Sequence, residues 1–389
     1  MLALWPLLLP IAAWSGWCAA KKTTKKQSPN MPDLLSQGYV KGVNYILNEQ
    51  PDKAIDVFIQ MLEVDDDTVE THLALGGLFR RRGEVDRAIR IHQNLIARPQ
   101  LARSQRVEAL MALGKDYMCA GVYDRAERIF KEVVELGGHA EADSLKNLLS
   151  IYQQQKSWLK ALDVLKKLQQ LSGLSHALQL AHCYCELVEE QISAKQYHKA
   201  SQTLKYAISA DKHLVRVSLL QGKLEYLLGN YRQAIKAYKK VSHQDSNYIP
   251  EMIGPLYECY QSLGQVAQFQ QYLLILLESK PSTSIIFFIA KELRQQQGQE
   301  VAIDFVTEQL NKNPSLKGLK RLIEWHLNQA YGKVKLKLSM LHKITEKLLE
   351  DKPVYRCQSC GFSGKHLHWS CPSCKQWSTI KPISGIEGE

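Results

Sequence analysis

Four cysteines near the end of the chain have the spacing of metal ligands. Two residues separate Cys357 from Cys360, two separate Cys371 from Cys374, and ten lie between the pairs. Two residues between thiols allow one tight turn to direct both sulfurs at a single ion, and two such turns supply a closed tetrahedral site. The pattern therefore predicts one iron or zinc ion bound by these four cysteines.

The residues next to the cysteines suit such a site. Gly361 follows the first pair, where a positive φ lets backbone N–H groups turn toward the sulfurs, and Pro372 stiffens the second turn. Four thiolates around a divalent ion leave a net charge of about −2, which Arg356, Lys365 and Lys375 can offset. The alternative is two disulfides, which the otherwise cytosolic character of the chain disfavours.

The first twenty residues differ from the rest, because Met1 to Ala20 contain no charged side chain. Twenty helical residues span about 30 Å, the hydrocarbon thickness of a bilayer. Four lysines follow directly, and this flank predicts a transmembrane anchor at residues 1–20 whose body lies in the cytoplasm. A cleaved signal peptide is the alternative, although its positive charge would precede the apolar run. Residues 21–33 are interpreted as a basic linker.

Residues 34–313 repeat with a period close to that of tetratricopeptide units. An alanine opens the second helix of successive units at steps of 34, 38, 35, 39 and 34 residues, namely Ala54, Ala88, Ala126, Ala161, Ala200 and Ala234. A bulky residue follows four positions later in most units: Phe58, Phe130, Leu165, Leu204 and Tyr238. Turns between the paired helices are predicted at Gly83, Gly121, Gly229, Gly264 and Gly298. Phe269 and Ile303 occupy the alanine position in two weaker units.

This pattern predicts an all-α superhelix of helical hairpins, in which no unit buries its apolar face without the next. Residues 314–352 are predicted to form a final hairpin, and residues 353–389 a small metal-binding domain. The apolar faces of that hairpin, which include Leu341, Ile344 and Leu348, are expected to provide the surface on which the metal domain docks. The concave face of the superhelix is the expected site for a protein or peptide partner.

The chain carries 50 Lys and Arg against 39 Asp and Glu, a formal charge of +11, and a pI near 9.0. This balance favours an acidic partner or an anionic membrane surface. Five arginines cluster in the second unit, either as a solvated face or as a partner or lipid site: Arg80, Arg81, Arg82, Arg87 and Arg90. Nucleic acid is not expected, because basic residues do not alternate with exposed aromatic residues.

No catalytic motif is present: the sequence contains neither H-E-x-x-H nor G-x-S-x-G, and no phosphate-binding loop. We therefore expect no enzymatic activity. His182, Cys183 and Cys185 form a possible ligand cluster, but buried repeat positions explain them better, because residues two apart on a helix point to different sides. His366 and His368 lie between the cysteine pairs and are interpreted as bystanders.

The whole length resembles the lipopolysaccharide assembly protein B family of Gram-negative bacteria. The resemblance rests on the uncharged N-terminal segment, the repeat segments from Asn48 to Ile55 and from Arg80 to Leu95, and the terminal segments Tyr355 to Cys357 and Trp377 to Pro382. It implies a single-pass inner-membrane protein with a cytoplasmic body and a rubredoxin-like metal domain. The cysteine pairs lie closer together than in true rubredoxins, which leaves both iron and zinc possible.

The resemblance also implies a function in lipopolysaccharide biosynthesis. The chain would be an adaptor that promotes proteolysis of the deacetylase committing precursor to lipid A, by the membrane-bound AAA-type zinc protease. Other lipopolysaccharide-synthesis or membrane regulatory proteins are further expected partners. The alternative is a metal-redox or metal-sensing protein with a four-cysteine iron centre. The aromatic residues around the cysteines fit both, because they could shield iron or build the core of a segment too small to fold without metal: Tyr355, Phe362, Trp369 and Trp377.

Overall fold

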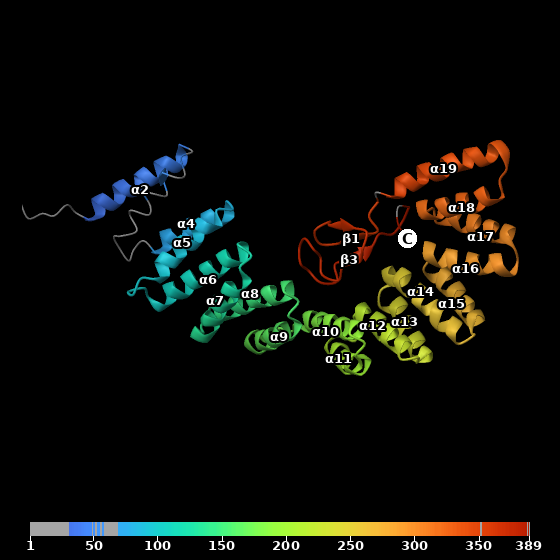
Figure 1. The fold of residues 1–389 in the computed structure, drawn as a ribbon, viewed down its shortest axis with the longest axis horizontal. Helices are drawn as coiled ribbons and strands as arrows, with labels where there is room; N and C mark the ends of the chain where they lie inside the picture. The colour runs from blue at the N-terminus through green and yellow to red at the C-terminus, as the bar shows by residue number, and fades with distance from the viewer. Residues whose placement is uncertain are drawn as a thin grey trace, which may run out of the picture. The chain divides into compact units, whose positions relative to one another are not determined.

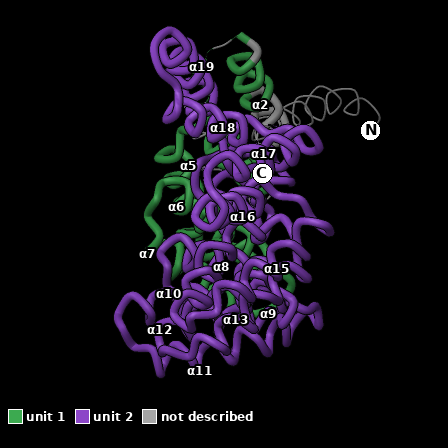
Figure 2. Tube along the Cα trace, turned by 90° about the vertical axis from the view of Figure 1, so that its right-hand side faces the viewer, with its two compact units in different colours: residues 1–140 green, residues 141–389 purple. Residues whose placement is uncertain are grey.

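The computed structural model describes residues 31–48, 50, 53, 54, 57, 69–350, 352–386 and 388. The predicted transmembrane anchor, residues 1–20, lies outside the described residues, as do residues 21–30 of the predicted linker. Within the described ranges, no helix combines the length and apolar character that a membrane span requires. The chain divides into two compact units, residues 1–140 and residues 141–389 (Figure 2).

The described part of the first unit consists of helices. Its described elements are α2 (Met31–Leu47), α4 (Val69–Arg81), α5 (Val85–Ile96), α6 (Arg103–Cys119) and α7 (Tyr123–Leu136). Helices α4 and α5 form one antiparallel hairpin, and α6 and α7 form the next. This pairing is the tetratricopeptide arrangement that the period of the alanines predicts.

The second unit continues the hairpins and ends in a small sheet (Figure 1). Its helices are α8 (Glu141–Gln154), α9 (Trp158–Ser172), α10 (Ala177–Ser193), α11 (Tyr197–Ala210), α12 (Val215–Leu227), α13 (Tyr231–Gln244), η2 (Ser246–Tyr248), α14 (Ile249–Ser262), α15 (Val266–Ser279), α16 (Thr283–Gln296), α17 (Gln299–Lys312), α18 (Leu316–Gln329) and α19 (Gly332–Glu350). Strands β1 (Tyr355–Cys357), β2 (Ser363–Gly364) and β3 (Ile380–Pro382) follow. They form an antiparallel sheet in the order β2-β1-β3. The predicted all-α superhelix with a terminal metal domain is confirmed as a fold class.

Small residues on one helix admit large residues on its neighbour. Each alanine of the predicted series is buried, and a Cβ added to Gly222 would lie 2.5 Å from the ring of Tyr238. A Cβ added to Gly114 would lie 2.7 Å from the ring of Phe130, and one added to Gly76 would overlap the ring of His92. The absence of a side chain therefore lets the paired helices approach closely. Phe58 lies outside the described residues.

The predicted turn glycines all have a positive φ, from 66° at Gly264 to 100° at Gly298. Two units have lysine at the corresponding turn instead, with φ of 55° at Lys156 and 58° at Lys195. A side chain in this region costs about 1 kcal/mol relative to glycine. The fold therefore enforces the turn even where the sequence gives no turn signal.

The arginine cluster of the second repeat is not one continuous basic face. Arg80 forms an ion pair of 2.7 Å with Asp116, whose carboxylate is buried and also hydrogen-bonds the ring of His92. Arg87 instead pairs with Glu84 at 2.6 Å. Arg80 therefore stabilises the contact between α4 and α6, a role that the sequence did not predict.

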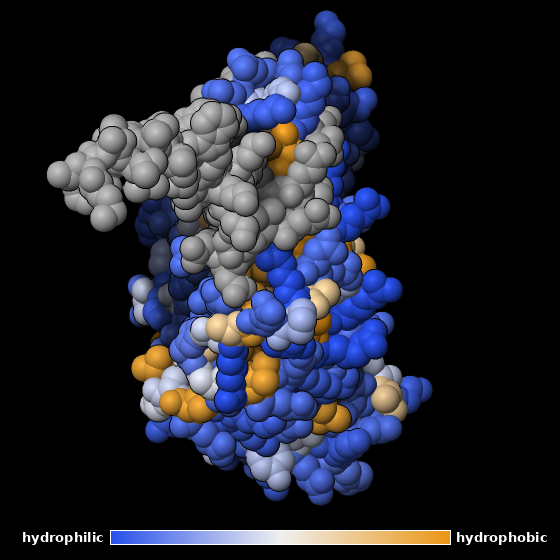
Figure 3. Space-filling view, turned by 90° about the vertical axis from the view of Figure 1, so that its left-hand side faces the viewer, coloured by the Kyte–Doolittle hydropathy of each residue, from blue (hydrophilic) through white to orange (hydrophobic). Residues whose placement is uncertain are grey.

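The coloured surface in Figure 3 is mainly hydrophilic, with hydrophobic residues scattered over it.

Adjacent glycines in α4 provide a matched test of this packing. Gly76→Ala places a methyl group against the His92 ring, whereas Gly77→Ala meets only side-chain ends at 3.8 Å and beyond. We expect Gly76→Ala to lower the free energy of unfolding by about 1–3 kcal/mol through overpacking. Gly77→Ala should raise it by about 0.5–1 kcal/mol through helix propensity. Denaturant unfolding of both variants measures the difference, and equal effects would contradict the packing argument.

Candidate metal centre and its docking site

The two cysteine turns have the same backbone hydrogen bonds. In the first, Gly361 N–H donates to Cys357 O at 3.1 Å, and in the second Lys375 N–H donates to Cys371 O at 2.9 Å. The N–H of each leading cysteine donates to the carbonyl five residues later, at 2.7 Å and 2.9 Å. Gly361 has the positive φ that the sequence predicts, 77°, and Lys375 has the equivalent value, 60°. Sequence reasoning missed Lys375 because lysine is rarely found in this conformation.

The turns bring the four cysteine sulfurs together. All four Sγ atoms lie within 4.8 Å of one another. Cys357 Sγ is 3.8 Å from Cys374 Sγ, and Cys360 Sγ is 3.6 Å from Cys371 Sγ. A tetrahedral ion with metal–sulfur bonds of about 2.3 Å requires sulfurs about 3.8 Å apart. The donor set and its spacing therefore fit one metal ion bound by four cysteines, whereas the sulfurs are too far apart for disulfides.

Local contacts shift the pKa values of two of these thiols in opposite directions. The hydrogen bond between Cys357 Sγ and Thr379 Oγ1, 3.3 Å long, lowers the pKa of the Cys357 thiol to about 6. Burial raises the pKa of the Cys371 thiol to about 11. The backbone and Thr379 thus favour one thiolate, while a cation is needed to offset the charge of the buried one. His366 and His368 are not part of this group of sulfurs.

The metal domain packs on the repeats through stacked aromatic rings. The Trp377 ring lies on the His182 ring of α10, with 4.6 Å between centroids and 20° between planes. Trp158, the first residue of α9, meets the edge of Trp377 at 6.4 Å. Ser378 Oγ is 2.7 Å from His182 Nε2. His182 is fully buried, and its pKa is lowered to about 3 by burial and by the charge of Arg216.

Arg216 of α12 is a buried charge next to the contact between His182 and the metal domain. Its guanidinium pairs with Glu186 at 2.8 Å and Glu189 at 3.0 Å, and its side chain is 2% exposed. Burial alone would lower the pKa of Arg216, but the two carboxylates outweigh burial and raise it. The guanidinium is 3.4 Å from His182 Nδ1 and lies over the Trp369 ring, 5.5 Å from its centroid. Because arginine can only donate, His182 accepts at Nδ1 and donates from Nε2 to Ser378.

A second set of contacts joins the sheet to η2 and α14. The Tyr248 hydroxyl donates to Ile380 O at 2.8 Å, and the Tyr248 ring stacks on Trp369 with 5.4 Å between centroids. Lys381 Nζ is 2.8 Å from a carboxylate oxygen of Asp245. Tyr355 donates a hydrogen bond to Glu251. Strands β1 and β3 therefore lie against η2 and α14, on the inner side of the curve that helices α10 to α14 make in Figure 1.

The predicted docking surface on the final hairpin is wrong. The contacts of Trp369, Trp377 and Lys381 go to α9, α10, α12 and η2 and to Asp245, while Leu341, Ile344 and Leu348 of α19 remain exposed. Apolar periodicity identifies a face that needs a partner, but it cannot show which partner covers it. The C-terminal tail does reach the hairpin, where Ile386 O accepts a hydrogen bond from Leu316 N–H at 2.8 Å.

The cluster at the start of α10 has two separate roles. Cys183 and Cys185 are buried repeat residues, and burial raises the pKa of each to about 12. His182 is also buried, but it contacts the metal domain. Sequence reasoning missed this role, as it missed that of Arg216. A histidine and an arginine among the apolar positions of these repeat segments were the available signal. A buried polar side chain needs a specific partner, so such residues indicate a contact beyond the repeat packing.

These observations define a class of protein, a tetratricopeptide-repeat scaffold with a four-cysteine metal domain built into it. Family models agree: residues 355–382 match the rubredoxin metal binding domain and residues 71–103 a tetratricopeptide repeat. The chain is 40% identical over 393 residues to lipopolysaccharide assembly protein B of Escherichia coli K12, covering 100% of both chains. It is 37% identical over 396 residues to the protein of that name from Haemophilus influenzae, again covering 100% of each. The chain therefore belongs to the lipopolysaccharide assembly protein B family.

Replacement of a cysteine in the metal site should remove the ion. We expect Cys357→Ser and Cys371→Ser to lose the metal and unfold residues 353–389, because binding energy of about 10–16 kcal/mol holds such small sites together. Cys119→Ser, which changes an exposed free cysteine on α6, is the matched control. Metal analysis of the purified proteins measures the effect, and parental metal content in either site variant would contradict the assignment. A red parent protein that bleaches with reductant indicates iron, and a colourless one with stoichiometric metal indicates zinc.

The neutral state of His182 predicts a pH dependence. The unfolded chain protonates this ring below a pH of about 6.5, and the folded chain only near its lowered pKa of about 3. Its contribution to stability is therefore complete above pH 6.5 and is lost as the pH falls toward 3, on the order of 1 kcal/mol per pH unit.

His182→Gln removes this titration and keeps a side chain that can hydrogen-bond Ser378. Denaturant unfolding between pH 7 and pH 5 should therefore show a steeper acid loss for the parent than for the variant. Parallel curves would show that His182 is not held neutral.

Proposed function

We propose that the chain is a membrane-anchored, non-enzymatic adaptor on the cytoplasmic side of the inner membrane. It regulates lipopolysaccharide biosynthesis by bringing the committed-step lipid A deacetylase to the membrane-bound AAA-type protease. In this proposal, residues 1–20 are the anchor, 21–33 a basic linker, 34–313 the repeats, 314–352 the last hairpin and 353–389 the metal domain. Cys357, Cys360, Cys371 and Cys374 are the four metal ligands.

The relation to lipopolysaccharide assembly protein B over the full length carries the assignment to this pathway. The match to these relatives includes both the repeats and the metal domain. A mechanism that this chain shares with them would therefore use both parts. The protease and the deacetylase are supported only by the resemblance that the sequence motifs carry.

The docking of the metal domain supports an adaptor role. Trp377 contacts α9 and α10, Trp369 contacts α10, α12 and η2, and Lys381 pairs with Asp245 between α13 and η2. One folded domain thereby ties several successive repeats into one surface. Such a surface can hold a client in a fixed orientation, and a membrane anchor raises the local concentration of that client near a membrane protease.

The half-life of the deacetylase in cells tests this function. Depletion of the chain should lengthen the half-life, and re-expression of the parent should restore it. Deletion of residues 1–20 should leave the repeats folded but weaken complementation, because the tether is lost. Cys374→Ser should also weaken it by releasing the metal domain, whereas Cys119→Ser should complement fully. An unchanged half-life on depletion would refute the adaptor function.

A further inference from the structure

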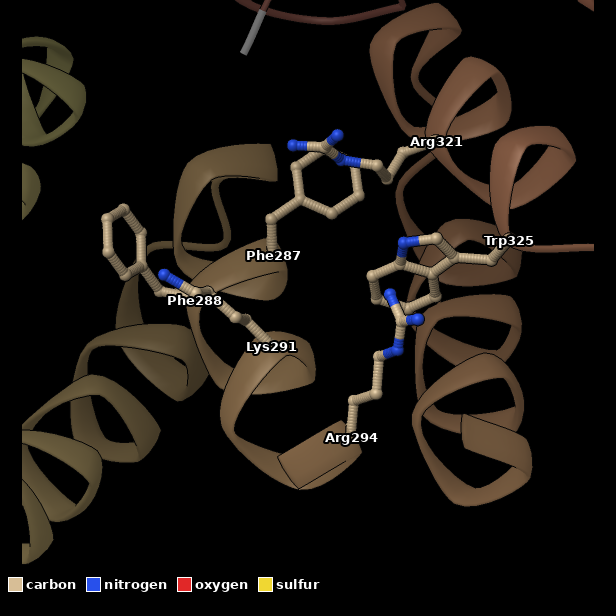
Figure 4. A pocket seen from close by; sticks show the side chains of 6 residues that line it. All are labelled: Phe287, Phe288, Lys291, Arg294, Arg321 and Trp325. Atoms are coloured by element: carbon tan, nitrogen blue, oxygen red, sulfur yellow. The ribbon is translucent and has the colours of Figure 1, made fainter. Parts of the chain in front are cut away.

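A basic, aromatic pocket lies between α16 and α18, at a distance along the chain from the metal centre. Its volume is about 370 Å³. The residues that line it are three aromatic residues and three cations, with no carboxylate among them: Phe287, Phe288, Lys291, Arg294, Arg321 and Trp325 (Figure 4). The pocket therefore combines apolar walls with positive charge.

The two arginines are held in place by the opposite helix. Arg321 extends from α18 over the ring of Phe287 on α16, with 5.7 Å between guanidinium and ring centroid (Figure 4). Arg294 extends from α16 over the ring of Trp325 on α18, at 5.8 Å. Cation–π contacts orient a guanidinium without neutralising it. The charges are thus positioned in advance, which lowers the entropic cost of binding an anion.

Most of this positive charge is not compensated by carboxylates. Arg321 has one ion pair, 3.1 Å from Glu324, and both side chains are partly exposed. In the part of the chain that the structure describes, Lys291 and Arg294 form no ion pair. Lys291 lies over the ring of Tyr257 at 5.5 Å, so its contact is with an aromatic face. The pocket therefore retains charge for a bound anion.

The pocket lies beside the surface on which the metal domain docks. That domain contacts the first helix of several successive hairpins, through His182 of α10, Arg216 of α12 and Glu251 of α14. Helices α16 and α18 are the first helices of the next two hairpins. Phe288 packs against the same hydrophobic core as Leu367 and Trp369 of the metal domain. The pocket therefore lies on the same face of the second unit as the metal domain, on the next two first helices, α16 and α18.

We propose that this pocket binds an acidic peptide segment. A carboxylate lies between Arg294 and Arg321 and near Lys291, and a neighbouring apolar side chain lies against Phe288. Arginine suits this role because its planar guanidinium can bind a carboxylate with two parallel hydrogen bonds. A bare inorganic anion would leave the aromatic walls without a partner. A nucleobase would find no free face on Trp325, which is 7% exposed and already covered by Arg294.

This inference goes beyond the proposed adaptor function, because it names the chemistry of the segment that is recognised. It rests on that function only in assigning the segment to a client protein. Binding is measured on the purified chain, so the result does not depend on the deacetylase half-life. The two ideas can therefore fail separately.

A labelled peptide with two glutamates flanked by phenylalanines is the probe, and the full chain in detergent micelles is the binding partner. Fluorescence anisotropy should show saturable binding that weakens with salt. Replacement of both glutamates by glutamine should abolish most of it. Inorganic phosphate and adenosine monophosphate serve as competitors that represent a bare anion and a nucleotide.

Variants locate the site. Arg294→Gln and Arg321→Gln should each weaken peptide binding by about tenfold, since each removes a charge-assisted hydrogen bond. Lys291→Gln should weaken it less. Arg232→Gln changes an exposed arginine on α13 and is the matched control, expected to bind as the parent does. All four changes affect exposed side chains, so metal content and melting temperature should remain parental.

Parental affinity in both arginine variants would overturn the proposal, as would equal binding of the glutamate and glutamine peptides. Competition by phosphate or by adenosine monophosphate at concentrations below that of the peptide would also overturn it. Those outcomes would assign the pocket to a bare anion or to a nucleotide instead.

Discussion

The stacking of Trp377 on His182 is the contact on which the second unit depends most. It joins residues 195 positions apart in sequence, with ring centroids 4.6 Å apart, and it requires a neutral imidazole at the repeat surface. Burial and, after it, the charge of Arg216 oppose protonation of His182 and lower its pKa, while Glu186 and Glu189 compensate the arginine. A buried charge with two partners is costly to break, so the network specifies one docked position for the metal domain.

Metal binding and docking are coupled through the chain itself. Trp377 and Ser378 lie three and four residues after Cys374, and Ser378 has a positive φ of 58° that a serine rarely adopts. Cys371 N–H donates to Gln376 O, and Ser378 N–H donates to Trp369 O, so the second cysteine turn fixes the segment that docks. An ion that organises the four sulfurs therefore also positions the side chains that contact α10 and α12. The energy of metal binding can in this way stabilise the repeats.

The sequence predicted the features that depend on local spacing. The period of the buried alanines gives the hairpins, the glycines give the turns, and the spacing of two residues brings the cysteine sulfurs together. It could not predict features that depend on which surfaces meet. The sequence predicted His182 as a buried repeat residue, Arg80 as part of a cluster that is either a solvated face or a partner or lipid site, and the final hairpin as a docking face. Periodicity shows that one side of a helix is apolar or charged, but it does not identify the partner of that side. Lys156 and Lys195 carried no turn signal, since the fold imposes their φ.

Hydrogen–deuterium exchange with and without metal tests most directly whether the metal domain holds the repeats together. The parent protein is compared before and after removal of the ion by a chelator, with α5 and α7 of the first unit as an internal reference. We expect backbone amides of α10, α12 and α14 to lose protection when the ion is removed, while those of α5 and α7 do not change. Unchanged protection in α10, α12 and α14, together with unfolding of residues 353–382, would show that the repeats do not depend on the docked domain and would contradict the account.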